Sequence, residues 1–184
     1  MPPITTVAES LYWCYANLAM AHAAVESEAL TYGRTHFMIR SRLYKGLTNN
    51  TMGLGSIADD ERLKMILPQA CCYCGGREKL SIDHLIAKIR GGEDRAENMV
   101  WACRFCNSSK GDTDLLDWYH AKNAFPPLLL LRRYLKIAIE ICHESNLLNT
   151  PLAEAPRLPF ALSSVPHAFP KPTELTLWVI PLDL

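Results

Sequence analysis

Apolar residues recur at helical spacing in two long stretches of the chain. Residues 7–30 contain no Gly or Pro and are rich in Ala, with apolar side chains at Leu11, Tyr15 and Leu18. This spacing predicts a long first helix. A second apolar stretch, residues 128–142, follows two prolines and predicts the last helix.

Between these helices the pattern changes to that of short strands. Apolar residues in 80–86 and 99–102 flank a Gly-Gly pair, which indicates a hairpin with a long loop. The pattern after this hairpin favours a helix over 107–122. Acidic residues at the start of 59–68 predict a further short helix that ends before Pro68.

Prolines are concentrated at the C-terminal end. Seven of the twelve follow Thr150, so we expect residues 151–184 to form an extended tail with one short strand at 175–180. The aromatic residues of this tail, among them Phe160 and Trp178, indicate that it packs on other parts of the protein. The chain thus divides into a helical region, a compact core, a helix and a Pro-rich tail, at residues 1–68, 69–122, 123–150 and 151–184.

Composition and charge narrow the class of protein. With 184 residues, 49% of them hydrophobic, the chain is long enough to bury a core without disulfides, and disorder, collagen and coiled coil are excluded. The apolar stretch 11–25 is too short and too polar for a signal peptide or a membrane span, so we expect a cytoplasmic protein. Nineteen basic and 19 acidic residues cancel, so binding to nucleic acid must depend on local clusters.

One such cluster follows the first predicted helix. Arg34, Arg40, Arg42 and Lys45 occur with no acidic residue between positions 31 and 50, and aromatic residues lie among them. Two interpretations stay open: a solvated helix face, or a surface that contacts a phosphate backbone.

Four of the seven cysteines have the spacing of a metal site. Cys71-x-x-Cys74 and Cys103-x-x-Cys106 supply the two pairs of thiolates that tetrahedral Zn²⁺ requires. A disulfide framework is the weaker alternative in a cytosolic protein. We interpret Cys72 as a bystander, because a Cys-x-Cys spacing is uncommon.

Residues between and after these cysteine pairs suggest a second, catalytic metal. Asp83 and His84 lie on the first predicted strand, where neighbouring side chains point to opposite faces and can serve different partners. The carboxylate of Asp83 and the amide of Asn107 offer the oxygen ligands that Mg²⁺ prefers. His84 can take a proton from water near neutral pH.

The order of these elements resembles a known family. Residues 71–110 contain, in sequence, Cys-x-x-Cys, Asp-His, Gly-Gly, Asn98 and Cys-x-x-Cys-Asn-x-x-Lys. This run is similar to an HNH endonuclease domain of the zinc-containing ββα-metal type. It departs from the family pattern at Ala87, where Pro is usual, and at Asn107, where His is frequent. The second change favours Mg²⁺ or Mn²⁺ over softer metals.

The resemblance implies a role for each residue of the motif. His84 would be the general base that activates water, and Asp83 and Asn107 would hold one catalytic Mg²⁺ or Mn²⁺. Asn98 would brace the hairpin loop and orient His84. The four cysteines Cys71, Cys74, Cys103 and Cys106 would bind structural zinc. Four cations near the site, Lys88, Arg90, Arg104 and Lys110, either contact the nucleic-acid backbone or are ordinary solvated residues.

These inferences predict an α+β protein with a zinc-stapled ββα-metal core of the treble-clef-like HNH type, flanked by helices and an extended Pro-rich tail. The expected function is metal-dependent hydrolysis of phosphodiester bonds, in DNA more than in RNA. Two alternatives are a non-catalytic zinc module that binds nucleic acid or protein, and a nuclease that acts only with a protein partner. Homodimerisation is also open, and no membrane partner is expected.

Overall fold

The computed structural model describes residues 2–55 and 69–179. It is an α+β structure with one two-stranded sheet, as the sequence predicts. The predicted helix at 59–68 lies outside the described residues. In chain order the helices and strands are α1 (Val7–Glu26), α2 (Arg34–Thr48), β1 (Leu80–His84), β2 (Met99–Cys103), α4 (Arg104–Lys110), α5 (Leu115–Ala121) and α6 (Leu128–Glu144). Five short 3₁₀ turns are η1 (Lys88–Arg90), η2 (Ala96–Asn98), η3 (Leu152–Glu154), η4 (Leu162–Ser164) and η5 (Pro172–Glu174).

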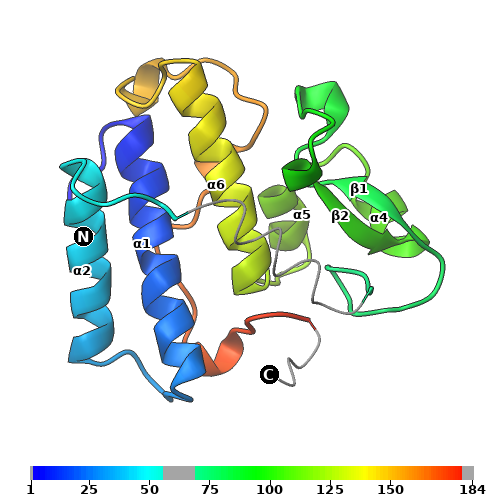
Figure 1. Cartoon of the computed structure of the whole chain (residues 1–184), viewed down its shortest axis with the longest axis horizontal. Helices are drawn as coiled ribbons and strands as arrows, with labels where there is room; N and C mark the ends of the chain where they lie inside the picture. Colours follow the sequence, from blue (N-terminus) through cyan, green and yellow to red (C-terminus); the bar gives the residue numbers. More distant parts are fainter. Residues whose placement is uncertain (1, 56–68, 180–184) are drawn as a thin grey trace.

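Three long helices form one side of the molecule. Figure 1 shows α1 between α2 and α6, with the β-hairpin on the far side of α6. Thr6 caps the start of α1 by accepting a hydrogen bond from the backbone of Glu9, whose carboxylate accepts one from the backbone of Thr6. Twelve of the 20 residues of α1 are buried, as expected for a helix that is apolar on most faces.

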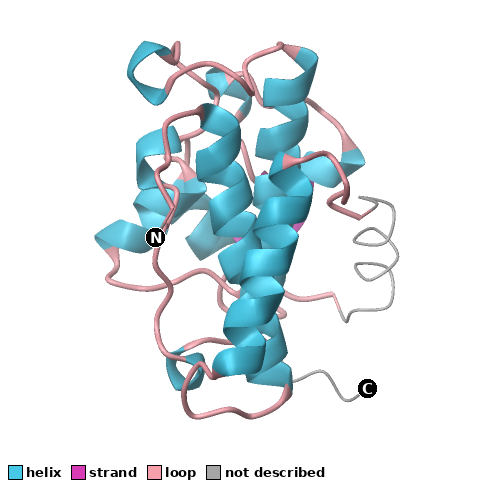
Figure 2. Cartoon of the chain, turned by 90° about the vertical axis from the view of Figure 1, so that its left-hand side faces the viewer, coloured by secondary structure: helices cyan, strands magenta, loops and turns pink. Residues whose placement is uncertain are grey.

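The basic cluster of the sequence lies on α2, which has only two buried residues. One of its four cations, Arg40, makes contacts within the protein. Its guanidinium lies 4.7 Å from the ring centroid of Trp13 and 5.1 Å from that of Phe37, and it donates to the side-chain oxygen of Asn17. The other three, Arg34, Arg42 and Lys45, are exposed. Viewed from this side, the helices stand in front of the sheet (Figure 2).

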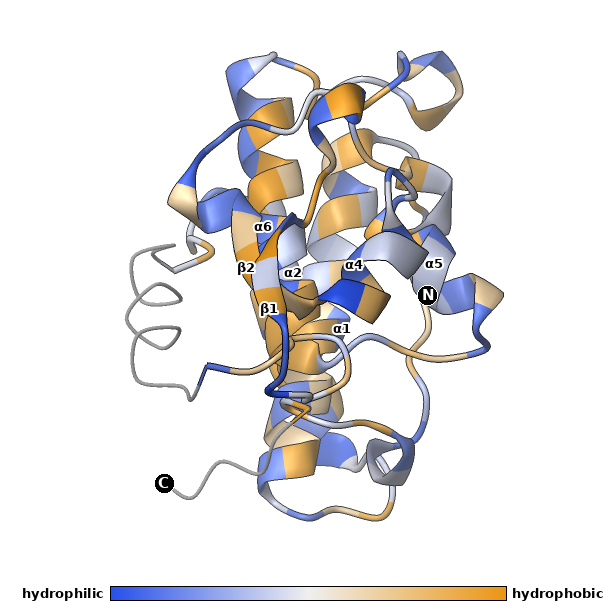
Figure 3. Cartoon of the chain, turned by 90° about the vertical axis from the view of Figure 1, so that its right-hand side faces the viewer, coloured by the Kyte–Doolittle hydropathy of each residue, from blue (hydrophilic) through white to orange (hydrophobic). Residues whose placement is uncertain are grey.

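The hairpin and α4 form a compact ββα unit. β1 and β2 pair antiparallel, with Leu80 opposite Cys103 and His84 opposite Met99, and α4 follows β2 directly and contacts both strands. Figure 3 shows apolar residues along the strands and along the helices behind them. One continuous core joins these layers, so the unit packs on the long helices rather than standing apart.

The helix predicted at 107–122 is wrong as a single element, because the structure has two helices there. α4 ends at Gly111, whose backbone has φ +49 and ψ −129, a conformation that favours glycine. α5 then begins after Asp114, whose carboxylate accepts a hydrogen bond from the backbone of Leu116. The same buried carboxylate accepts hydrogen bonds from Tyr134 of α6 and Ala161 of the tail, so it joins three segments.

The described part of the tail, residues 151–179, crosses several other elements. The backbone oxygen of Pro159 accepts a hydrogen bond from Arg90, and that of Pro170 accepts one from Tyr32. The predicted strand at 175–180 is absent from residues 175–179. Backbone oxygens of Thr176 and Leu177 instead accept hydrogen bonds from the first turn of α6, where helical N–H groups have no partner within the helix. Among the described residues, no helix is long and apolar enough to cross a membrane.

Candidate nuclease site

The four predicted zinc ligands come together at one end of the hairpin. The sulfurs of Cys71, Cys74, Cys103 and Cys106 all lie within 4.8 Å of one another, and those of Cys74 and Cys103 are 3.7 Å apart. Four sulfurs at 2.3 Å from one tetrahedral zinc would be roughly 3.8 Å apart. The cluster therefore fits a structural zinc ion.

The local backbone conformation brings these sulfurs together. The chain turns tightly after Cys71, whose backbone oxygen accepts from Gly75 and whose N–H donates to Gly76, with Gly75 at φ +76. Cys103 ends β2, and Cys106 lies in the first turn of α4. The backbone N–H of Cys106 donates to the sulfur of Cys103 and lowers the pKa of that thiol to about 7. A lowered pKa favours the thiolate that binds metal.

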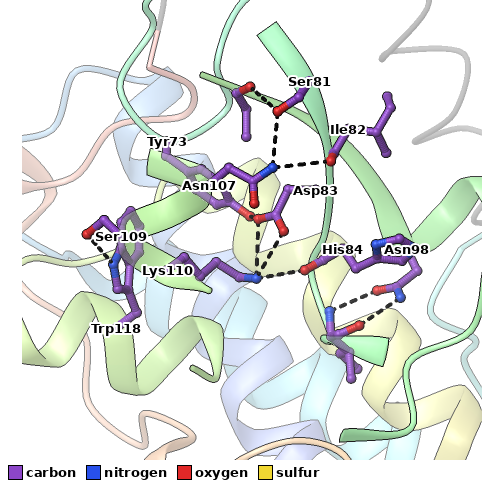
Figure 4. Close-up of polar contacts among 12 residues, drawn as sticks. Tyr73, Ser81, Ile82, Asp83, His84, Asn98, Asn107, Ser109, Lys110 and Trp118 are labelled. Carbon is purple, nitrogen blue, oxygen red and sulfur yellow. Dashed lines mark hydrogen bonds and ion pairs between the residues drawn. The ribbon is translucent and has the colours of Figure 1, made fainter. Parts of the chain in front are cut away.

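Asp83 points inward from β1 toward α4. Its carboxylate accepts a hydrogen bond of 2.5 Å from the Tyr73 hydroxyl and lies 3.2 Å from the Lys110 ammonium. The same ammonium donates to the backbone oxygen of His84 at 2.7 Å. Figure 4 shows these groups converging beneath the strand. Lys110 thus binds both the side chain of Asp83 and the backbone of the next residue, His84.

Asn107 approaches the same point from α4. Its side-chain nitrogen donates to the hydroxyl of Ser81 and to the backbone oxygen of Ile82. These two bonds fix the amide plane and place the amide beside the Asp83 carboxylate (Figure 4). Among the described residues nothing donates to its side-chain oxygen, so that oxygen is available to a cation.

His84 points to the other face of β1, as strand alternation predicts. Its Nε2 lies 2.7 Å from Oδ1 of Asp94, and 21% of its side chain is exposed. The second carboxylate oxygen of Asp94 pairs with Lys88. His84 therefore faces solvent at the edge of the loop that joins the two strands.

Asn98 braces this loop from inside. Its side-chain oxygen accepts from the backbone of Ile86, while its nitrogen donates to the backbone oxygens of Ile86 and Glu93. Gly92 makes the closure possible, since a Cβ there would lie 1.8 Å from the Ile86 oxygen. In the described part of the chain, the side-chain hydrogen bonds of Asn98 go to the backbone of the loop and not to the His84 ring.

The four predicted cations differ in their surroundings. For Lys110 the sequence left open a contact to nucleic acid or an ordinary solvated position, and neither fits, because its side chain is fully buried and offers no surface to a phosphate. Lys88 pairs with Asp94, and Arg90 donates to Pro159 of the tail. Arg104 is exposed at the start of α4, beside Phe105, which is 78% exposed.

Sequence reasoning missed two residues of the site. Tyr73 lies within the first cysteine pair, and its position carries no signal that its hydroxyl reaches Asp83. Asp94 is two residues after the Gly-Gly pair, where a sharp turn sends the chain back toward the strand. The Gly-Gly turn was a signal that the chain returns toward the strand. It did not reveal that Asp94 would reach His84, because that contact depends on the path of the loop.

Comparisons with known proteins match this part of the chain. Residues 71–113 match the family model for HNH endonuclease. The chain is also similar to the CRISPR-associated endonuclease Cas9 of Corynebacterium diphtheriae, with 36% identity over 80 residues. That alignment covers 40% of this chain and 7% of the relative, so the chain spans only a small part of its length. No solved structure gives a significant match.

Proposed function

We propose that this chain, whose residues 71–113 match the family model for HNH endonuclease, is a metal-dependent endonuclease that hydrolyses phosphodiester bonds, with DNA as the expected substrate. The observation that carries the proposal is the joint placement of Asp83, His84 and Asn107 on one hairpin and its attached helix. A scaffold that only binds zinc has no need of this set.

Asp83 and Asn107 are the residues that would hold the catalytic cation. The free side-chain oxygen of Asn107 is one ligand. The Asp83 carboxylate contacts Tyr73 and Lys110, but a carboxylate has about four lone-pair sites and can serve a cation as well. Bound Mg²⁺ or Mn²⁺ supplies positive charge where negative charge develops during phosphodiester hydrolysis.

His84 is the proposed general base. Its imidazole is partly exposed on the outer face of β1, where a phosphodiester can approach it. A ring nitrogen would accept the proton of the attacking water, and Lys110 would hold the strand still through the His84 carbonyl. Lys88, Arg90 and Arg104 are the proposed contacts to the backbone of the nucleic acid; Lys88 and Arg104 are exposed and Arg90 is half-buried.

One observation favours a second candidate, a zinc module that binds nucleic acid without cutting it. The Lys110 ammonium already neutralises Asp83 from inside the protein, and this charge opposes a second cation. In such a module His84 would be dispensable, so a single experiment separates the two candidates.

The experiment compares wild type, His84→Ala and His120→Ala. Supercoiled plasmid, linear duplex, single-stranded DNA and RNA are incubated with Mg²⁺ or Mn²⁺. We expect wild type to cleave DNA and His84→Ala to be slower by about 10²- to 10⁴-fold, the range for loss of a general base. His120 is exposed on α5, so its variant should match wild type.

Zinc content of each variant, measured by elemental analysis, confirms that the fold is retained. Cleavage at an undiminished rate by His84→Ala would refute the assignment of the base. Absence of cleavage by wild type on all four substrates would favour the binding module.

A further inference from the structure

The loop between the two strands is held so that it returns to His84. Asn98 hydrogen-bonds the backbone at both sides of the loop, at Ile86 and at Glu93. Gly92 lets these two backbone segments approach more closely than any other residue would allow. The next residue after Glu93 is Asp94, so the brace positions the backbone from which the Asp94 side chain extends.

α6 holds the far end of the same loop. Arg133 donates hydrogen bonds to the backbone oxygens of Ala96 and Glu97, the latter through Nε. Arg95 pairs with Glu93 and lies near Glu140 and Glu144 of α6. The loop is therefore fixed from two directions, although the Asp94 side chain itself is 53% exposed.

The charge of Asp94 determines which ring nitrogen of His84 carries a hydrogen. The hydrogen bond from Lys88 and then that from His84 lower the pKa of Asp94, so its carboxylate is ionised at neutral pH and can only accept. The 2.7 Å contact to Nε2 of His84 therefore requires a proton on Nε2. In the neutral ring, Nδ1 then carries the lone pair.

We propose that Asp94 is the positioning residue of the general base: it fixes the ring and the tautomer of His84 so that Nδ1 accepts the proton from water. This inference rests on the proposed function. Asp94 does not touch the reacting atoms and acts only through His84. Lys88 fixes the carboxylate by holding its other oxygen.

Water loses one proton to Nδ1 of His84, and its oxygen forms a bond to phosphorus while the bond from phosphorus to the leaving oxygen breaks. The leaving oxygen takes a proton from solvent. The imidazolium that forms has a proton on each nitrogen and is stabilised by the Asp94 carboxylate at Nε2, until Nδ1 returns its proton to solvent.

The test compares Asp94→Ala with Asp112→Ala, which removes the same charge at an exposed position after α4, outside the loop. On duplex DNA with Mg²⁺, we expect Asp94→Ala to lower kcat by about 10- to 100-fold, the range found for residues that orient metal-binding histidines. KM should change little, and Asp112→Ala should match wild type. Asp94→Asn should be intermediate, because its amide oxygen can still accept.

A spectroscopic measurement supplies a readout that a merely structural role would not change. In protein labelled with ¹⁵N-histidine, long-range ¹⁵N–¹H spectra should show His84 of wild type as the Nε2–H tautomer. In Asp94→Ala its two ring nitrogens should shift toward each other, while the other five histidines keep their positions.

Each remaining result would overturn the inference. Unchanged kcat in Asp94→Ala would exclude a positioning role, and a higher kcat would mean that Asp94 obstructs the base. Restoration of Asp94→Ala by excess Mg²⁺ would make Asp94 a metal ligand instead. A wild type that does not cleave would defeat the proposed function, whereas the spectra would still show whether Asp94 selects the tautomer.

Discussion

Lys110 illustrates how a single residue differs from its expected role. Lysine is rarely buried, so the sequence suggested a surface cation, either solvated or in contact with phosphate. In the structure its side chain has no exposed area and pairs with Asp83, which is 8% exposed. The cation supports the strand that carries Asp83 and His84, and contributes to the site from inside.

Lys110→Met should destabilise the protein by about 3–5 kcal/mol, because it leaves the Asp83 carboxylate buried without its partner. Urea unfolding in zinc-saturated buffer measures this change. The double variant Asp83→Asn with Lys110→Met should recover part of the loss. Lys171→Met, at an exposed position of the tail, should change the free energy of unfolding by less than about 0.5 kcal/mol. Equal changes in the free energy of unfolding for Lys110→Met and Lys171→Met would contradict the buried ion pair of Lys110 and Asp83.

The features that the sequence predicted correctly are those that depend on residues close together in the chain. Cysteine spacing predicted the cluster at Cys71 and Cys103, and alternation predicted that Asp83 and His84 would face different partners. The break between α4 and α5 was missed because it depends on the conformation of Gly111, which spacing does not reveal. The contact of Asp94 with His84 was missed because it depends on the folded path of a loop.

The cysteine cluster joins the segment before β1 to the end of β2 and the first turn of α4, so loss of a metal bound there should loosen the whole ββα unit. Cys74 is exposed, and Cys74→Ser therefore costs little packing of its own. We expect this variant to lose the single bound zinc and several kcal/mol of stability, since binding energy of a structural zinc is folding energy. Elemental analysis measures the zinc content, and thermal unfolding measures the loss of stability.

Cys72→Ala is the matched control for this prediction. Cys72 is buried next to Cys71 but does not belong to the cluster. Its variant should retain one zinc per chain. Zinc content well below one per chain in wild type, or zinc lost equally from both variants, would contradict a site built from Cys71, Cys74, Cys103 and Cys106.

For the molecule as a whole, the tail connects the ββα unit to the long helices. Its anchor on α1 is His167, whose Nε2 lies 2.9 Å from the Ser10 hydroxyl and whose backbone oxygen accepts from Trp13 and Asn17. Burial lowers the pKa of His167 below its usual value of 6.5. The docked ring is therefore neutral under conditions where a free ring would be charged.

Acidification should release this anchor. As pH falls through about 6.5, the undocked His167 binds a proton that the docked ring resists, so docking loses stability. We expect amide exchange in residues 160–175, corrected for its intrinsic pH dependence, to be faster at pH 5.5 than at pH 7.5. His167→Gln should remove most of this difference. An identical pH dependence in wild type and His167→Gln would refute the assignment.

Two contacts that hold the loop between β1 and β2 also set an order of events during protein synthesis. The hairpin and α4 are complete by residue 113, but Arg133 and Pro159, which hold the loop, are made later. At about 5–20 residues per second, Pro159 is added about 2 to 9 s after residue 113. During translation the ββα unit thus exists before α6 and the tail hold its loop. A growing chain on the ribosome can form both contacts only after residue 159 has been made.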